Sequence, residues 1–279
     1  MLIPQKNVTF SRFTLYMVCS FLLFTQVNYP LKPTTVYAQE DTTATAKVSR
    51  LKEASEIWDV SKVSTSQVQS QRKLIALTFD DSPASTLDGI VKVFLDYNST
   101  HSDAPATATI FCNGKNIKPS THVSLQTAFA AGFELGNHTQ NHKNLFLLSP
   151  EEIKEELIKT DRLLHSFDKK STHLIRAPYG NVNENVRSVA TAPIIDWFID
   201  TLDWTGISEE IITETVLTGC FSGAIILMHD GYPQTINALK RLLPALKEKG
   251  YQAVNVSKLI KAHRFVFYRG KEYVRARKR

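Results

Sequence analysis

An acidic pair, Asp80-Asp81, ends an apolar run at residues 74–79 and is the first pattern in this 279-residue chain that could do chemistry. A short apolar run followed by Ser82-Pro83 is typical of a buried strand. Two adjacent carboxylates are disfavoured in the core that such a strand enters, so we expect them at its C-terminal rim, near cationic groups. One Asp would be enough to cap a helix or a turn, which leaves the second for a chemical role.

Two histidines, His138 and His142, stand four residues apart further along the chain. On a helical turn this spacing would place both imidazoles on one face, where they could bind one metal ion. Because the chain has eight histidines, a pair of unrelated surface histidines is the alternative. Two histidines and one carboxylate that leave a position for water form the usual zinc hydrolase site. One Asp of the pair would then be a ligand and its neighbour a base.

Arg176 follows the apolar residues Leu174-Ile175 and precedes the rigid sequence Ala-Pro-Tyr-Gly at 177–180. The arginine could be solvated in a plain loop. It could also pair with a carboxylate, while a backbone N–H of the turn faces a developing oxyanion.

Asp203, Trp204 and His229 follow two further strand-like runs. Asp203 could cap a turn or orient a histidine, and Trp204 could pack in the core or stack against a sugar. A lone histidine at the end of a strand is usually structural. If a carboxylate such as Asp203 pairs with it, His229 can act as a general acid with a raised pKa.

Strand-like and helix-like segments alternate from residue 73 onward, which predicts an α/β fold with a mainly parallel sheet. The strand-like runs are 74–79, 108–112, 133–135, 174–175, 194–199, 224–228 and 252–256. The helix-like runs are 86–97, 121–131, 150–167, 183–190, 209–218 and 235–249. About seven β/α units favour an open or distorted barrel over a two-layer sandwich, and active residues of such folds gather at the C-terminal ends of strands.

The N-terminal region predicts export. Lys6 and Arg12 precede an uncharged apolar stretch at 13–27, which is short for a membrane-spanning helix of about 20 residues and suits a secretory signal. The sequence Val-Tyr-Ala at 36–38 resembles a cleavage site but lies far from the apolar stretch. We therefore expect residues 1–38 to be a signal peptide or an N-terminal membrane anchor, and the protein to be secreted or at the cell surface.

The rest of the chain divides into three parts by composition. Residues 39–72 are polar and predict a linker, residues 73–263 contain the predicted strands and helices and form the domain that holds the candidate residues, and residues 264–279 are a basic C-terminal tail. The tail has seven Lys and Arg against one Glu, and we expect it to be solvated and partly frayed, with contact to an anionic surface as the alternative. Cys112 and Cys220 flank or follow apolar residues and are expected to be buried free thiols.

Together these segments resemble the polysaccharide deacetylase family, carbohydrate esterase family 4, over roughly residues 73–260. All five signature segments of the family appear in family order. The resemblance implies a distorted (β/α) barrel and metal-dependent removal of acetyl groups from N-acetylated sugars. One departure is visible, because the first signature usually continues Gly-Pro where this chain has Ser82-Pro83.

The resemblance also implies roles for the acidic pair and its partners. Asp80 would be the catalytic base, tethered by Arg176. Asp81, His138 and His142 would be the ligands of a divalent metal, which we expect to be Zn²⁺.

In the later signatures, the backbone N–H of Tyr179 would help to form the oxyanion hole. Asp203 would orient His229, the general acid. Trp204 and Leu227 would line the pocket for the acetyl group.

The substrate implied is an acetylated polysaccharide, with N-acetylglucosamine of peptidoglycan as first choice. Chitooligosaccharides and acetylxylan are alternatives within the family. A non-catalytic carbohydrate-binding protein of the same fold, or a basic surface-adhesion protein, would be alternatives of another class. We expect a monomer that does not bind nucleic acid and whose basic tail could contact a cell-wall polymer.

Overall fold

A parallel β-sheet surrounded by helices forms the centre of the computed structural model, which describes residues 56–61 and 72–276. The expected signal or anchor at residues 1–38 and most of the expected linker at 39–72 lie outside the described residues. Within the described part of the chain, no helix is both long and apolar enough to span a membrane.

The element bounds follow the predicted alternation closely. The strands are β1 (Lys73–Ser82), β2 (Thr109–Cys112), β3 (Glu134–Asn137), β4 (Ile194–Ile195), β5 (Ile199–Asp200), β6 (Ile225–His229), β7 (Tyr251–Val254) and β8 (Glu272–Tyr273). The α-helices are α2 (Leu87–Thr100), α3 (His122–Ala130), α4 (Pro150–Asp168), α5 (Glu184–Val189), α6 (Glu209–Gly219), α7 (Pro233–Glu248) and α8 (Val256–Ala262). Short 3₁₀ turns are η1 (Gly114–Asn116), η2 (Pro119–Thr121), η3 (Leu145–Leu147), η4 (Pro178–Gly180) and η5 (Asp203–Thr205).

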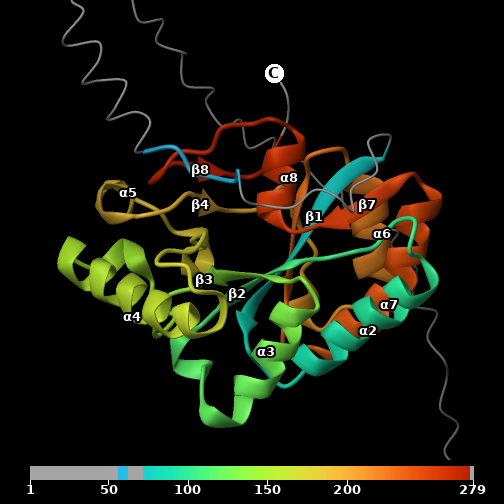
Figure 1. Cartoon of the computed structure of the whole chain (residues 1–279), viewed down its shortest axis with the longest axis horizontal. Helices are drawn as coiled ribbons and strands as arrows, with labels where there is room; N and C mark the ends of the chain where they lie inside the picture. The colour runs from blue at the N-terminus through green and yellow to red at the C-terminus, as the bar shows by residue number, and fades with distance from the viewer. Residues whose placement is uncertain (1–55, 62–71, 277–279) are drawn as a thin grey trace, which may run out of the picture. The chain divides into compact units, whose positions relative to one another are not determined.

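Strand β1 is the centre of the sheet. It pairs in parallel with β2 on one side and with β6 on the other, and its first residues also pair with β7. The order β3-β2-β1-β6-β5 confirms the mainly parallel α/β fold. Figure 1 shows α2, α6 and α7 on one side of the strands and α4 and α5 on the other.

The far side of the expected barrel is irregular. Ile175 forms single parallel bridges to Asn137 at the end of β3 and to Ile194 in β4, so the predicted strand at 174–175 is reduced to one paired residue. The predicted strand at 194–199 is split into β4 and β5, and only β5 pairs with β6. Single bridges in place of continuous ladders therefore distort the barrel on this side.

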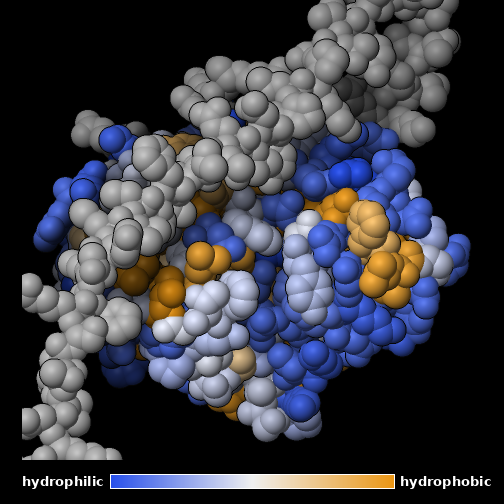
Figure 2. Space-filling model, turned by 180° about the vertical axis from the view of Figure 1, so that it is seen from behind, coloured by the Kyte–Doolittle hydropathy of each residue, from blue (hydrophilic) through white to orange (hydrophobic). Residues whose placement is uncertain are grey.

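Most apolar side chains are buried inside the sheet and under the helices. The largest cluster packs α2, α6 and α7 against the strands and includes Phe79, Phe94 and Met228. Figure 2 shows, on the opposite face from Figure 1, a largely hydrophilic surface on which hydrophobic residues form separate patches. Among the described residues Cys112 and Cys220 are both free, and Cys112 is buried whereas Cys220 is only half-buried.

The C-terminal segment differs from the sequence-based expectation. We predicted a solvated, partly frayed tail from residue 264, but its described part, 264–276, forms β8 in parallel with β4 and fully buries Phe267 and Ala276. The physical reason is that alternating aromatic residues accompany its positive charges. The ring of Phe267 stacks on that of Tyr273 with centroids 3.7 Å apart and joins an apolar cluster with Leu74.

Candidate active site

A pocket of about 420 Å³ opens at the carboxyl ends of β1 and β6. The register of this strand pair sets Asp80 directly beside His229. The pocket is lined by Asp80, Asp81, His138, His142, Tyr179, Trp197, Asp200, Trp204, Leu227, His229 and Tyr232. Adjacent parallel strands end at the same edge of the sheet, which brings the chemically interesting side chains together.

Asp80 is buried and is held by a buried arginine. Arg176 Nη1 donates to Asp80 Oδ1 at 2.8 Å and to Thr78 Oγ1 at 2.7 Å, while Arg176 Nε donates to the carbonyl of Ile195 at 2.8 Å. The guanidinium also lies over the ring of Phe111, 4.2 Å from its centroid. The guanidinium therefore provides the counter-charge for this carboxylate. The other oxygen, Asp80 Oδ2, lies 3.6 Å from His138 Nε2.

Asp81, His138 and His142 form a compact set of possible metal ligands. Their donor atoms all lie within 4.8 Å of one another. Nε2 of His142 is 3.4 Å from Asp81 Oδ1, and Nε2 of His138 is 3.8 Å from the same oxygen. His138 Nδ1 lies 2.8 Å from the carbonyl of Arg176, so this nitrogen carries the proton and Nε2 keeps a lone pair toward the pocket. Two imidazoles and a carboxylate fit a divalent ion such as zinc and leave coordination positions for water or substrate.

The two histidines are not on a helical turn, and that prediction was wrong. Thr139 and His142 adopt left-handed backbone conformations, with φ of 66° and 57°, so the loop folds back on itself. Glu156 of α4 holds the loop, because its carboxylate accepts from the backbone and side-chain N–H groups of Asn141 at 2.7 and 2.8 Å. Tertiary contacts, rather than helical spacing, therefore bring the imidazoles together.

Left-handed backbone conformations concentrate around the pocket. Of the seven non-glycine residues with positive φ in the described ranges, five lie in the end of β1 and the turns around the pocket: Asp81, Thr139, His142, Tyr179 and Leu202. Such conformations cost energy for residues with side chains and persist where surrounding contacts enforce them. Here they point adjacent residues of one loop in different directions, as at Asp80 and Asp81.

Two asparagines that the sequence analysis did not identify hold Asp81. Asn113 Nδ2 donates to Asp81 Oδ1 at 2.8 Å, and Asn116 Nδ2 donates to the Asp81 carbonyl at 3.1 Å. Asn113 directly follows β2, so the rule that active residues follow strand ends could have found it. Asn116 lies in η1, and no sequence signal marks it.

His229 and Asp203 form a hydrogen-bonded pair in which Asp203 is buried and His229, at the pocket, is half-buried. Asp203 Oδ1 lies 2.8 Å from His229 Nδ1, and Asp203 Oδ2 accepts from the His229 backbone N–H at 2.8 Å and from Thr235 Oγ1 at 2.6 Å. Burial lowers the pKa of His229, but the hydrogen bond to Asp203 and the charge of Asp80 outweigh it, so the pKa is raised above its ordinary value. The imidazole is therefore suited to donate a proton from Nε2.

The serine that departs from the family pattern has a definite partner. Ser82 Oγ donates to Asp230 Oδ2 at 3.1 Å, and the same buried carboxylate accepts from the Ala84 backbone N–H at 2.7 Å and from Thr86 Oγ1 at 2.7 Å. Asp230 directly follows His229. These bonds connect the residues after Asp80-Asp81 to the end of β6 and so hold the ends of β1 and β6 together.

The structure brings all ten sequence-identified residues to this one end of the sheet. Eight of them line the pocket, and Arg176 and Asp203 lie behind it as the partners of Asp80 and His229. The sequence analysis missed three lining residues, Trp197, Asp200 and Tyr232. Asp200 directly follows the predicted strand at 194–199, so the same rule would have included it. Trp197 lies inside that run and Tyr232 lies four residues beyond the run at 224–228, so the rule does not reach them.

A larger hollow of about 640 Å³ lies elsewhere, lined in part by Trp58, Glu134, Lys169, Lys258 and Arg269. The described residues that line it include no histidine and no cysteine, and Glu134 already accepts hydrogen bonds from Thr109 and Ser257. Size alone therefore does not mark the reactive site.

Comparisons with known proteins agree with this geometry. The family model described as polysaccharide deacetylase matches residues 67–193. A peptidoglycan-N-acetylglucosamine deacetylase of Bacillus cereus is 35% identical over 65% of this chain and 66% of its own length. A second protein of that name from Bacillus cereus is 32% identical over 71% of this chain and 92% of its own length.

Among solved structures, the Xyl-CE4 domain of a multidomain xylanase from the hindgut metagenome of Trinervitermes trinervoides superposes with a TM-score of 0.68. It is 28% identical, and the match covers 74% of this chain and 98% of that domain. Some curated relatives are longer than the matched part of this chain. The match spans 66% of the length of the first Bacillus cereus relative and 39% of the length of a peptidoglycan-N-acetylglucosamine deacetylase of Listeria monocytogenes.

Proposed function

The chain belongs to the polysaccharide deacetylase family, and from that membership we propose that it is a hydrolase that removes N-acetyl groups from N-acetylglucosamine units of an extracellular polysaccharide. Peptidoglycan is the first proposed substrate. The observation that carries the proposal is the convergence, in one pocket, of Asp80, a three-residue ligand set and the His229–Asp203 pair.

We assign Asp81, His138 and His142 to a divalent metal, for which Zn²⁺ is our choice because the donors are two imidazoles and one carboxylate. When bound, such an ion polarises a carbonyl and lowers the pKa of water. The hydrogen bond from His138 Nδ1 to the Arg176 carbonyl and that from Asn113 to Asp81 orient the donors before any ion arrives.

Asp80 and His229 divide the proton transfers. Asp80 takes a proton from the attacking water, and its charge is kept in place by Arg176. His229, whose pKa is raised by the hydrogen bond to Asp203, donates its Nε2 proton to the departing amine nitrogen. The products are acetate and a free glucosamine unit.

The remaining side chains shape the pocket for an acetamide. We assign the backbone N–H of Tyr179 to the developing oxyanion, since Tyr179 lies in the left-handed turn η4 at the pocket. Leu227 and Trp204 give the pocket apolar surface against which the acetyl methyl group and a sugar ring can pack.

We also propose that the protein works outside the cytoplasm, secreted or held at the cell surface. The support is the basic start and uncharged apolar stretch of its N-terminal sequence. An extracellular location fits a polysaccharide substrate.

Acetate release from peptidoglycan, chitin oligomers and acetylxylan, with and without a chelator, tests the proposal. Wild-type protein should release acetate from one of these in a chelator-sensitive way, and the preferred substrate identifies the glycan. Absence of release from all three would instead favour a non-catalytic carbohydrate-binding protein.

The base assignment is tested by Asp80→Asn. The amide keeps an oxygen that accepts a hydrogen bond from Arg176, but it cannot take a proton from water as a carboxylate does. We expect turnover to fall by roughly 10²–10⁴-fold while metal binding is retained. Asp88→Asn, an exposed change in the first turn of α2, is the matched control and should leave turnover unchanged. Full activity of Asp80→Asn would refute the assignment.

A further inference from the structure

The positive charge of this chain is concentrated in its last residues. Residues 258–279 contain nine Lys and Arg against one Glu, a net charge of +8, whereas the whole chain has +6. The preceding 257 residues together therefore have a net charge of −2. Such segregation creates one strongly cationic region on an otherwise near-neutral molecule.

The last described residue of this region, Ala276, lies at the end of the sheet opposite the candidate active site. The Ala276 backbone N–H donates to the carbonyl of Gly223, and the Gly223 N–H donates to the carbonyl of Leu74, at 2.8 and 2.7 Å. Leu74 is at the amino end of β1, and Asp80 lies six residues further on, about 20 Å away along an extended strand. Ala276 thus lies at the end of β1 that is remote from Asp80, whereas β8 lies beside β4 at the edge of the fold.

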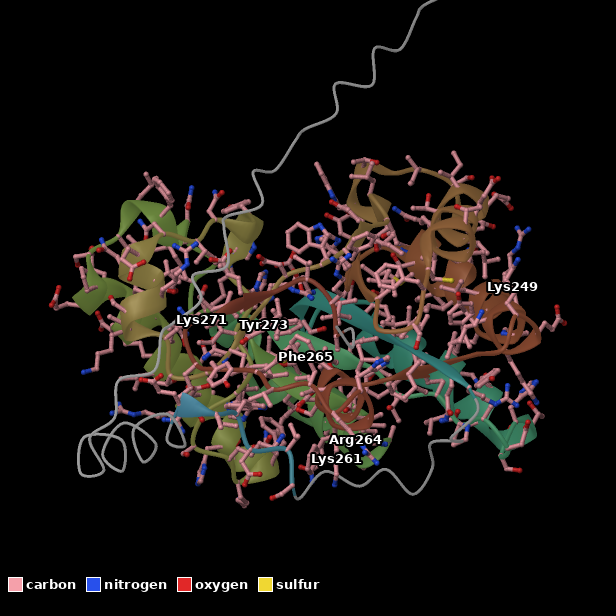
Figure 3. The ribbon with its side chains drawn as sticks, turned by 90° about the horizontal axis from the view of Figure 1, so that it is seen from above. Lys249, Lys261, Arg264, Phe265, Lys271 and Tyr273 are labelled. Atoms are coloured by element: carbon pink, nitrogen blue, oxygen red, sulfur yellow. The ribbon has the colours of Figure 1, made fainter. Side chains whose placement is uncertain are left out.

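Four exposed cations of this segment, with the apolar residues beside them, define what we call the basic face. The cations are Arg264, Arg269, Lys271 and Arg275. Among the described residues none of the four has an ion-pair partner, and the one acid of the segment, Glu272, is paired with Arg187. Figure 3 shows Arg264, Phe265, Tyr273 and Lys271 along the C-terminal segment, with Lys261 beside Arg264.

Apolar side chains are exposed among these cations. Because Phe267 and Tyr273 point inward and stack on each other, their chain neighbours Val266 and Val274 point outward, as the alternation of an extended chain requires. Val266 is 45% exposed and Val274 is 40% exposed, and Ile57, which bridges to Tyr268, is 37% exposed. Cations interspersed with shallow aliphatic groups are typical of a surface that binds an anionic membrane interface.

The N-terminal part of the chain enters the domain at this same face. The Trp58 backbone N–H donates to the Phe267 carbonyl at 2.8 Å, and the Arg269 N–H donates to the Glu56 carbonyl at 2.9 Å. In Figure 1 the segment 56–61 runs beside the C-terminal segment. Glu56, the first described residue, therefore lies beside the basic face.

We propose that the basic face docks on the anionic headgroups of a phospholipid membrane and turns the catalytic pocket away from the lipid, toward the polysaccharide. A wall polymer with phosphate groups would share the attraction to the four cations. The exposed valines and Ile57 favour the membrane, since a hydrophilic polymer gains nothing from them. This inference concerns orientation and goes beyond the proposed hydrolysis.

The test compares binding of the full chain to vesicles of phosphatidylcholine alone and of phosphatidylcholine mixed with phosphatidylglycerol. Any contribution of the N-terminal apolar stretch appears with both lipids, so the increment on adding phosphatidylglycerol is the readout. We expect a clear increment in wild type that shrinks as salt is raised.

Arg264→Gln with Lys271→Gln should weaken binding to the mixed vesicles by roughly 30-fold, since each such cation near an anionic surface contributes about 1 kcal/mol and 1.36 kcal/mol is tenfold. The matched control is Lys154→Gln with Lys240→Gln, two exposed lysines of α4 and α7, which should bind like wild type. Acetate release from soluble oligosaccharides should be the same in all three proteins.

Three outcomes would overturn the proposal. These are no phosphatidylglycerol increment in wild type, an equal loss in the control, or no loss in the double variant at the basic face. If wild type gains nothing from phosphatidylglycerol but binds wall sacculi through Arg264 and Lys271, the partner is a wall polymer. Because binding is measured apart from acetate release, failure here leaves the proposed activity standing.

Discussion

At its carboxyl end β1 brings Asp80 and Asp81 to a polar pocket, whereas at its amino end the same strand is covered by apolar residues of the C-terminal segment. Leu74 there packs in one cluster with Phe267 and Ala276. The carboxyl end contains buried charges and left-handed backbone, both of which cost stability. The amino end contains well-packed rings, which supply stability.

The difference indicates that the two ends have separate tasks. Arg176 is completely buried at the carboxyl end, and a buried ion pair is weak evidence for stability because desolvation offsets the attraction. Its value is in holding Asp80 ready for reaction. The apolar amino end offsets such costs. A change at the amino end should therefore leave catalysis intact, and a change at the carboxyl end should leave stability intact.

The largest effect on stability is expected from Phe267→Ala at the amino end. Removing a fully buried ring should lower the free energy of unfolding by about 3–5 kcal/mol, because a cavity replaces its contacts. Thermal denaturation measures this, and kcat of the remaining folded protein should be unchanged. Val266→Ala, at the exposed neighbouring position, is the control and should cost well under 1 kcal/mol. A loss of kcat in folded Phe267→Ala protein would mean that the two ends are coupled.

Asp203→Asn, at the carboxyl end, should lower kcat and leave the stability nearly unchanged. Without the carboxylate the raised pKa of His229 falls, and the tautomer of its imidazole is no longer fixed. We expect kcat to fall about 10²-fold or more, with a small change in melting temperature.

The pH profile of Asp203→Asn is the second measurement. The alkaline limb, where the general acid loses its proton, should move to lower pH because the pKa of His229 is lowered. Asp200→Asn, a neighbouring acid at the pocket, is the control and should keep the wild-type limb. An unmoved limb in Asp203→Asn would remove His229 as the acid.

The fold at the carboxyl end could be predicted from sequence because strand and helix periods were regular there. The helix predicted at 150–167 is α4, and the capping box Ser149–Glu152 with Pro150 at its first position marks where it begins. The C-terminal segment was misread because its charges dominate its composition. Only the contact with Leu74, which is far away in sequence, shows that its aromatic residues are buried.

Within the site, the residue types could be predicted, but the way they are held could not. A strand-end position predicted that Asp80 and His229 would meet. The loop that brings His138 to His142 depends on Glu156, fifteen residues from Asn141, and no local pattern encodes that contact. Trp197 and Tyr232 were missed because an aromatic residue after a strand is as often core as pocket wall.

His173 offers another test of the comparison, because its polar contacts stabilise the fold and it does not line the pocket. Its ring is buried between Asp161 and Asp168, at 2.8 and 3.1 Å. Burial lowers the pKa of His173, but the hydrogen bonds to Asp161 and Asp168 outweigh it and raise the pKa above its ordinary value. The stabilisation is therefore complete below about pH 6.5, the unfolded value, and is lost as the pH rises through the folded pKa.

His173→Gln should cost about 1.5–3 kcal/mol at acidic to neutral pH, since hydrogen bonds to charged groups are lost. The cost should shrink at alkaline pH, where the wild-type histidine is neutral as well. Denaturant unfolding across pH measures both. His165→Gln, an exposed histidine of α4, is the control and should show no such pH dependence. A pH-independent cost in His173→Gln would show that the imidazole is neutral in the folded protein.

The smallest expected effect comes from comparing two tryptophans, one at each end of β1. Trp204 lines the pocket and is 51% exposed, which leaves a face free to pack against a sugar ring, whereas Trp58 packs at the amino end beside Phe267. Aromatic stacking is worth about 0.5–1.5 kcal/mol, so Trp204→Ala should raise KM roughly two- to tenfold with little change in kcat. Trp58→Ala should leave KM unchanged and lower the melting temperature instead. The comparison of the two ends predicts that one variant changes KM and the other changes the melting temperature. Equal KM values for the two variants would contradict it, because substrate contact would then not be confined to the carboxyl end.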